Sequence, residues 1–327
     1  MRRRDMLTTA YGALLVSVVP AVAEQSRGLS RVGYLFSFAA AEGEHLWKAC
    51  VSGLTSLGYT PGRNVLLEPR WAEGAHSLLP DLVRQLVASR VNVIVAAATP
   101  AALATKSGAP RIPMVFVAVA DPIGVGLVQS FARPGGNATG VSLLTPELSG
   151  KRVQLLAEVL KRMPSLATLS NPANRSHIVF LEETRTAASQ LRAEIQPLSA
   201  RDAAQIDLAF KSAAEQGVSG LVVFDDPVLW SHRRRVVALA KTLRIPVMYG
   251  YSEYVEEGGL ISYGPYRPAL YERTAAFVDK ILNGANPAGL PVEQPTRFEL
   301  MVNLGAAKEL GIQVPESVVI AADRVIE

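Results

Sequence analysis

Few residues in this chain of 327 have the types and spacing that catalysis needs. No serine occupies a G-x-S-x-G elbow, and the acidic pairs 225–226 and 256–257 are adjacent, which does not place two carboxylates across a substrate. The single cysteine cannot form an internal disulfide or a zinc site built from thiolates. The histidines are scattered and form no HExxH pair: His45, His76, His177 and His232. We therefore predict a protein that is not an enzyme, with no catalytic residues, metal ligands or cofactor.

Polar residues that follow apolar runs are better candidates, and for binding rather than catalysis. Thr99 and Pro100 follow the run Val93–Ala98, and the pattern predicts a helix from Ala101 to Lys106 with Thr99 as its cap and Pro100 at its first position. The free amides and positive dipole end of such a helix suit a carboxylate. The alternative is that this pair only caps the helix.

The corresponding place later in the chain carries acids. Asp225 and Asp226 follow the run Leu221–Phe224, and either carboxylate could hold an ammonium group. Together with Thr99 they would suit a zwitterion held between two walls of opposite polarity. Asp226 is equally well explained as the cap of the next helix.

Aromatic residues follow two further runs. Phe38 comes after Val32–Phe36, and Tyr251 comes after Val247–Tyr249. Rings in such loops can stack on a flat ligand, each adding about 0.5–1.5 kcal/mol beyond the buried area. The candidate ligand-binding residues are Ser37, Phe38, Thr99, Pro100, Asp121, Asn171, Asn174, Asp225, Asp226 and Tyr251.

Three of these candidates have competing explanations. Asn171 and Asn174 could donate side-chain hydrogen bonds to a ligand, but Asn171-Pro172 is also typical of a turn. Asp121 opens a glycine-containing segment that lacks the Walker lysine and the full GxGxxG spacing, so a nucleotide site is not expected.

The runs that position these residues are short and almost wholly apolar, as strands covered on both faces are. They are Val32–Phe36, Val65–Trp71, Val93–Ala98, Met114–Ala118, Leu166–Leu169, Leu221–Phe224 and Val247–Tyr249, and a further strand, Thr139–Leu143, is expected after the turn at Gly135-Gly136-Asn137. Between them, segments such as Glu147–Met163 and Tyr271–Leu282 repeat apolar residues at helical spacing, and Gly284 closes the second. This alternation predicts an α/β protein with mainly parallel sheets.

The pattern also repeats along the chain. Three segment pairs match at offsets of about 130 residues: Arg111–Phe116 with Arg244–Tyr249, Val93–Pro100 with Leu221–Pro227, and Val32–Phe36 with Leu166–Leu169. The repeat predicts two Rossmann-like lobes of the same strand order, joined by a multi-strand hinge. We expect 30–145 and about 266–298 in lobe 1, and 146–265 and about 299–327 in lobe 2. Ligands lie beyond the carboxyl ends of parallel strands, so two facing edges would act as a clamp.

Residues 1–23 have the features of a cleaved export signal. Arg2, Arg3 and Arg4 precede an apolar run that is short for a membrane span, and Ala21-Val22-Ala23 fits a signal peptidase site, although a retained anchor is the alternative. The arginines resemble a twin-arginine signal, but a general secretory signal has the same charge pattern. The only cysteine, Cys50, lies well inside the chain, which excludes a lipoprotein. We predict a location in the periplasm.

Charge does not favour nucleic acid as a partner. The formal net charge is only +4, and the one basic run, Arg233-Arg234-Arg235, is typical of a solvated helix face.

Three segments carry a family resemblance: 119–128, 132–140 and 290–303, of which the run from Asp121 to Gly140 is the most specific. They resemble exported ABC-transporter substrate-binding proteins of the type-1 periplasmic-binding fold, in the branch that includes tryptophan- and phenylalanine-type binders. The resemblance covers roughly 30–326. It implies a receptor that captures a small solute and presents it, unaltered, to a membrane permease driven by an ATPase. Ser170 stands where the family often has an aromatic residue, and Arg175 is a second departure, so the solute is not defined.

We therefore expect a monomeric receptor for an amino-acid-like solute or an aromatic carboxylate. The alternatives are a periplasmic sensor that feeds a membrane kinase and, less favoured, an exported enzyme.

Overall fold

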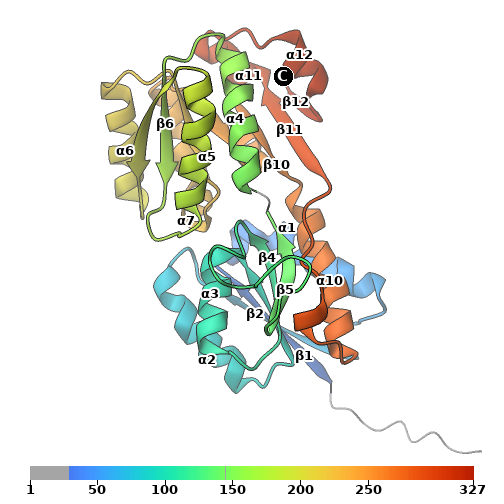
Figure 1. Cartoon of the computed structure of the whole chain (residues 1–327). Coiled ribbons are helices and arrows are strands. Elements are labelled where there is room, and N and C mark those ends of the chain that lie inside the picture. The colour runs from blue at the N-terminus through green and yellow to red at the C-terminus, as the bar shows by residue number, and fades with distance from the viewer. Residues whose placement is uncertain (1–28, 144) are drawn as a thin grey trace, which may run out of the picture.

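Strands and helices alternate along the chain and build two α/β lobes, one above the other in Figure 1. The computed structural model describes residues 29–143 and 145–327. The expected export signal, residues 1–23, lies outside the described residues. Lobe 1 is named here for the five-stranded sheet and lobe 2 for the seven-stranded sheet.

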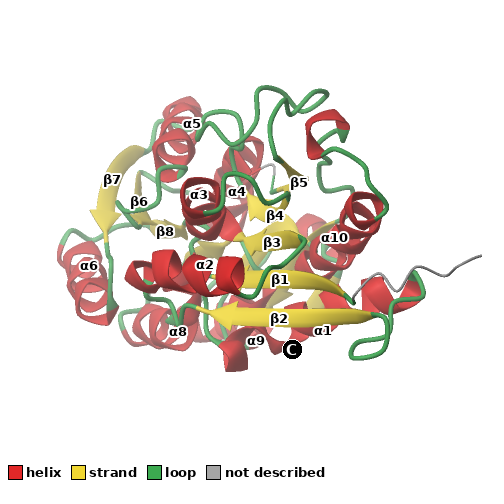
Figure 2. Ribbon diagram, turned by 90° about the horizontal axis from the view of Figure 1, so that it is seen from below, coloured by secondary structure: helices red, strands yellow, loops and turns green. Residues whose placement is uncertain are grey.

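Lobe 1 contains a parallel sheet in the order β2-β1-β3-β4-β5, whose strands lie side by side in Figure 2. The strands are β1 (Ser30–Phe36), β2 (Val65–Trp71), β3 (Val93–Ala97), β4 (Met114–Val119) and β5 (Ala138–Ser142). The helices are α1 (Ala40–Ser56), α2 (Leu79–Ala88), α3 (Ala98–Gly108) and α10 (Arg267–Leu282), with short 3-10 turns at His76–Leu78 and Pro287–Gly289. Because α1 and α10 pack on one face and α2 and α3 on the other, every residue of β3 and β4 is buried. This explains their continuous apolar runs.

Lobe 2 contains the sheet β12-β11-β10-β9-β8-β6-β7. Its strands are β6 (Ser165–Ser170), β7 (Glu194–Ser199), β8 (Gly220–Val223), β9 (Val247–Tyr249), β10 (Ile261–Pro265), β11 (Phe298–Asn303) and β12 (Arg324–Ile326). Its helices are α4 (Thr145–Leu160), α5 (His177–Gln190), α6 (Ala203–Glu215), α7 (Pro227–Ser231), α8 (Arg233–Thr242), α9 (Ser252–Glu256), α11 (Leu304–Leu310) and α12 (Glu316–Ala321). Among the paired strands of the described residues, only β10 and β11 run antiparallel. The prediction of mainly parallel sheets is confirmed.

The two sheets share one strand order. The series β2-β1-β3-β4-β5 in lobe 1 corresponds to β7-β6-β8-β9-β10 in lobe 2. The three segment pairs of the sequence repeat fall on β1 and β6, on β3 and β8, and on β4 and β9. The predicted repeat is confirmed.

The chain crosses between the lobes three times: between β5 and α4, between β10 and α10, and between the Pro287–Gly289 turn and β11. The second crossing returns α10 to lobe 1, where it packs along α1 (Figure 1). Gly284, with φ of 95°, directly follows the cap residue Asn283 at the end of this helix, as its pattern indicates.

The apolar-run pattern missed the strands with polar residues. In β7 only Leu198 is buried, since this strand lies at the edge of the sheet and pairs with β6 alone. An edge strand faces solvent and so lacks the apolar run of a central strand.

Candidate functional site

The carboxyl ends of strands from both sheets meet at one junction between the lobes. Oγ1 of Thr99 in lobe 1 lies 3.2 Å from Oγ of Ser176 in lobe 2. The rings of Phe38 and Trp230 meet edge to face, with centroids 5.0 Å apart. One apolar cluster runs from lobe 1 into lobe 2 and includes Phe38, Trp230 and Tyr251. The two walls expected from the sequence therefore share one buried surface.

On the lobe 1 side, Ser37 and Phe38 follow β1. The Ser37 hydroxyl donates a hydrogen bond of 3.1 Å to the carbonyl of Ala97 and so ties the end of β1 to the end of β3. The Phe38 ring packs on Trp71, at 5.9 Å between centroids. Gly43 is required beneath it, because a Cβ there would lie 2.2 Å from the ring.

The prediction that Thr99 caps a helix with Pro100 at its first position is wrong. Helix α3 begins at Ala98, its cap residue is Ala97, and no side chain makes a capping hydrogen bond. Ala98, the residue at which the helix begins, has a φ of 71°, so the chain turns sharply as it leaves β3. Thr99 and Pro100 lie in the first turn, and the hydroxyl of Thr99 faces Ser176 instead.

Ala118 repeats this backbone feature at the end of the neighbouring strand β4, with φ of 58°. Left-handed conformations of residues other than glycine cost on the order of 1–3 kcal/mol and cluster at functional sites. Both strained alanines, Ala98 and Ala118, lie at the junction edge of the lobe 1 sheet.

Asp121 serves its own loop. Its Oδ1 accepts a hydrogen bond of 2.8 Å from the amide of Gly124, and a Cβ at Gly124 would collide with the carboxylate. This is the geometry of a side chain that closes a turn.

On the lobe 2 side, Asp226 is saturated by donors of its own lobe. Its Oδ1 caps α7 by accepting from the amides of Val228 and Leu229, at 2.8 and 3.2 Å. The side-chain amides of Asn171 and Asn174 donate to Oδ1 and Oδ2 at 3.1 and 3.0 Å. The cap alternative for Asp226 is confirmed, and both asparagine amides are used within the protein.

Asp225 is also neutralised from within lobe 2. Nη2 of Arg152 lies 2.9 Å from Oδ2 of Asp225, and both side chains are 1% exposed. Nε of Arg152 donates to the carbonyl of Tyr263 at 2.8 Å. A Cβ at Gly250 would lie 1.7 Å from Oδ1 of Asp225, so backbone encloses the pair.

Arg267, the first residue of α10, fills the centre of the junction. It is 5% exposed. Its guanidinium carbon lies 4.3 Å from the ring centroids of both Trp230 and Tyr251. Its Nη1 lies 2.9 Å from Oε1 of Glu253 in α9. A helix of lobe 1 thus places a cation among aromatic rings of lobe 2.

Electrostatics keep both groups of this pair charged. Burial lowers the pKa of Arg267, but the Glu253 carboxylate together with the hydroxyls of Tyr271 and Tyr251 raises the pKa by more. Burial by itself raises the pKa of Glu253, but Arg267 and the hydrogen bond from His45 lower it to about 2. The pair is therefore ionic at neutral pH.

Several buried polar atoms at the junction have no hydrogen-bond partner among the described residues: Nε of Arg267, Nε1 of Trp230, Oε2 of Glu253 and Nε2 of His76. Buried polar atoms are nearly always paired in folded proteins, and an unpaired group indicates an additional partner such as a ligand or water. The junction therefore has unused hydrogen-bonding capacity, and most of it surrounds Arg267.

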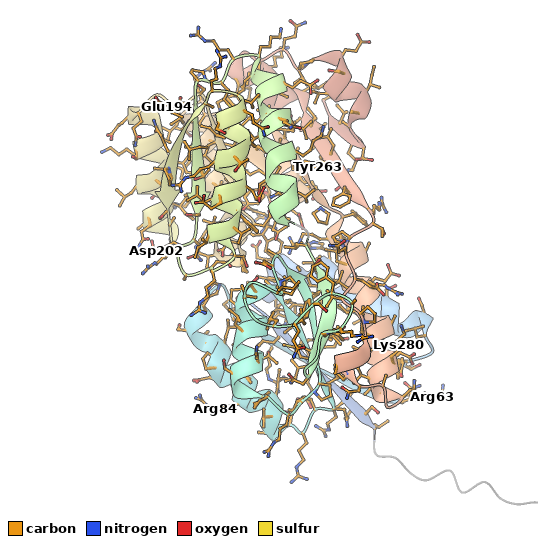
Figure 3. The ribbon with its side chains drawn as sticks, viewed as in Figure 1. Arg63, Arg84, Glu194, Asp202, Tyr263 and Lys280 are labelled. Carbon is orange, nitrogen blue, oxygen red and sulfur yellow. The ribbon has the colours of Figure 1, made fainter. Side chains whose placement is uncertain are left out.

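Ion pairs between the lobes border this centre. Arg233 of α8 pairs with Glu42 of α1 and lies 3.4 Å from Glu257. His45 of α1 lies 3.1 Å from Glu253. Other charged residues lie far from this centre: Figure 3 shows Arg63, Arg84, Glu194 and Lys280 on the outer faces of the lobes, and all four are exposed.

Residues 29–143 and 145–327 contain no group of three or more histidine, cysteine or acidic side chains that could hold a metal ion. Over the same residues, no helix combines the length and apolar character of a membrane span.

The sequence reasoning missed Arg267, Glu253 and Trp230. One signal was available for Arg267: it directly precedes Pro268, which marks the start of a helix, where a cation is disfavoured by the helix dipole. Nothing in the spacing linked it to Glu253 or Trp230, which reach it only through the fold.

One relative of this chain is named for the amino acid tyrosine. The chain is 23% identical over 267 residues to the tyrosine-binding protein of Clostridioides difficile, an alignment that covers 81% of this chain and 76% of that protein.

Two solved structures resemble the whole architecture. One is the ABC domain in complex with L-Trp from Streptococcus pneumonia, with a TM-score of 0.86, 27% identity, and coverage of 91% of this chain and 100% of that chain. The other is a conserved domain protein from Vibrio cholerae, with a TM-score of 0.86, 28% identity and the same coverage. The sequence model of the family of ABC transporter substrate-binding proteins matches residues 44–326. With its two lobes and the junction between them, the chain belongs to that family.

Proposed function

We propose that this protein is an exported receptor that captures an amino-acid-like solute or an aromatic carboxylate between its lobes and delivers it, unaltered, to the permease and ATPase of an ABC importer. The observation that carries the proposal is the polar and aromatic junction that joins the strand ends of both lobes around Arg267. Closure of two lobes on a solute needs contacts of this kind on both sides.

The relatives support the class of solute. The names of the two amino-acid binders mention tyrosine and L-Trp, both aromatic amino acids. Aromatic rings also dominate this junction, and we propose that Phe38, Trp230 and Tyr251 contact the solute. Export to the periplasm and action as a monomer are parts of the same proposal.

A thermal-shift screen tests it. The mature chain would be freed of carried-over solute by unfolding and refolding, and then mixed with amino acids, aromatic acids and short carboxylates. A true solute at 100 times its Kd should stabilise the protein by about 2.7 kcal/mol. A broad screen without a stabilising compound would contradict the receptor function.

Delivery needs a separate test in cells. Uptake of the labelled solute should fall when the gene is deleted and should return on complementation. Unchanged uptake together with a lost transcriptional response to the solute would instead favour the sensor alternative.

A further inference from the structure

We infer that the solute must carry a carboxylate and that Arg267 is the group that receives it. This inference rests on the proposed receptor function and deepens it by assigning the solute's obligatory charge to one residue. It moves the carboxylate away from the start of α3, the place that the sequence suggested.

The environment of Arg267 shows why it is more than a structural partner of Glu253. The guanidinium carbon lies over the rings of both Trp230 and Tyr251, 4.3 Å from each centroid, and contacts with ring faces leave the N–H groups to donate hydrogen bonds elsewhere. Nη1 donates to Glu253 and the Tyr271 hydroxyl of the same helix interacts with the guanidinium, but Nε is buried and makes no hydrogen bond among the described residues. A planar guanidinium with a free N–H edge is the preferred partner of a carboxylate in proteins.

Neighbouring groups favour an anion at the same place. Nε1 of Trp230 is a second buried donor with no partner in the described part of the chain, and its ring is in contact with the guanidinium. Arg267 is also the first residue of the 16-residue helix α10, at which no side chain makes a capping hydrogen bond. In Figure 1 this helix runs from the junction of the lobes down the side of lobe 1. Its free amides add to the attraction for an anion.

Other cations at the junction are less suited to a carboxylate. Arg152 is enclosed with Asp225, and Arg233, although its Nε is also buried without a partner in the described part of the chain, already faces two carboxylates, Glu42 and Glu257. At the start of α3, the Thr99 hydroxyl lies against Ser176. Arg267 therefore combines burial and an unpaired donor with a single carboxylate neighbour, Glu253, which leaves it better able than Arg233 to receive another carboxylate.

The experiment compares acids with their neutral amides. The ligands would be L-tryptophan and L-tyrosine, their desamino analogues indole-3-propionate and 4-hydroxyphenylpropionate, and the primary amide of each, titrated by calorimetry. We expect the acid of at least one pair to bind on the order of 100-fold more tightly than its amide, the factor that hydrogen bonds to a charged group supply. Equal affinities would overturn this inference and leave the receptor function standing. Absence of binding by every compound would count against both.

Variants assign the preference to Arg267. In Arg267→Gln the ratio of acid to amide affinity should fall to near one, and Arg267→Lys should restore part of it. In Glu253→Gln the ratio should rise, because the guanidinium loses its competing carboxylate. If Arg267 only positions Glu253, the ratio would not respond to either change, and the inference fails.

A second variant and a control complete this test. If Arg267→Gln does not fold, the double variant Arg267→Gln with Glu253→Gln removes both buried charges, and Glu253→Gln alone still gives an answer. Arg273→Gln is the matched control, since Arg273 lies on the same helix in a half-exposed pair with Glu293 and should leave the ratio unchanged.

Discussion

Two buried arginine–carboxylate pairs lie near the junction, and they differ in what surrounds them. Arg152 and Asp225 belong to the same lobe, are 1% exposed, and are enclosed by backbone at Gly250. Arg267 and Glu253 come from different lobes and leave one atom each without a partner in the described chain. The first pair is complete by itself, whereas the second joins a helix of lobe 1 to a helix of lobe 2 and retains capacity for a further group. Two features of a buried charge pair therefore point to a role in function: polar atoms that have no hydrogen-bond partner, and a position that joins elements of different lobes.

The largest expected effect concerns the enclosed pair. Replacing Arg152 with alanine leaves Asp225 buried without its partner, and we expect a loss of about 3–5 kcal/mol in the free energy of unfolding. Denaturant titration measures it. Arg185→Ala, which removes an exposed pair with Glu182, is the control and should change stability by less than about 1 kcal/mol. A loss of stability for Arg152→Ala as small as that for Arg185→Ala would contradict the view that the enclosed pair with Asp225 is complete by itself.

Acid should act on the pair that joins the lobes. Because the folded-state pKa of Glu253 is lowered from 4.5 to about 2, its ionised form stabilises the folded protein above pH 4.5, and this contribution is lost as the pH falls through 2. The shift corresponds to about 3 kcal/mol at neutral pH. Unfolding free energies measured from pH 6 to pH 2 should therefore fall more steeply for the wild type than for Glu253→Gln. Superimposable profiles would show that ionisation of Glu253 does not contribute to the pH dependence of the unfolding free energy.

The smallest expected effect concerns a neutral contact between the lobes. Thr99→Val removes the hydroxyl that faces Ser176, and the loss of one hydrogen bond of about 1 kcal/mol should weaken solute binding by about fivefold. Thr99→Ser keeps the hydroxyl and serves as the control. If valine and serine at this position bind equally well, the hydroxyl contact does not contribute to closure.

Much of the fold was predictable because its signals are local. A continuous apolar run predicted β9 with the bounds that it has, and the repeat at an offset of about 130 residues predicted the shared strand order. Buried parallel strands must be apolar on both faces, so their pattern needs no knowledge of partners. Strand β7 was missed because it lies at the edge of its sheet, where only Leu198 is buried, and so has no continuous apolar run.

The site was less predictable because its roles depend on partners. Asp225 and Asp226 looked alike as adjacent acids at the end of β8. In the structure one is paired with Arg152, more than 70 positions away, and the other caps α7 and accepts from two asparagines. A carboxylate is available to a ligand only if nearby donors leave it free, and those donors come from distant parts of the chain.

The amino-acid sequence by itself determined the two lobes, their common strand order and the family resemblance, since these follow from local apolar runs and short motifs. Only the tertiary structure decided which charges face one another, and so which remain able to bind. Arg267 illustrates the reason: its role depends on its contacts with Glu253, Trp230 and Tyr251, which only the folded protein brings together.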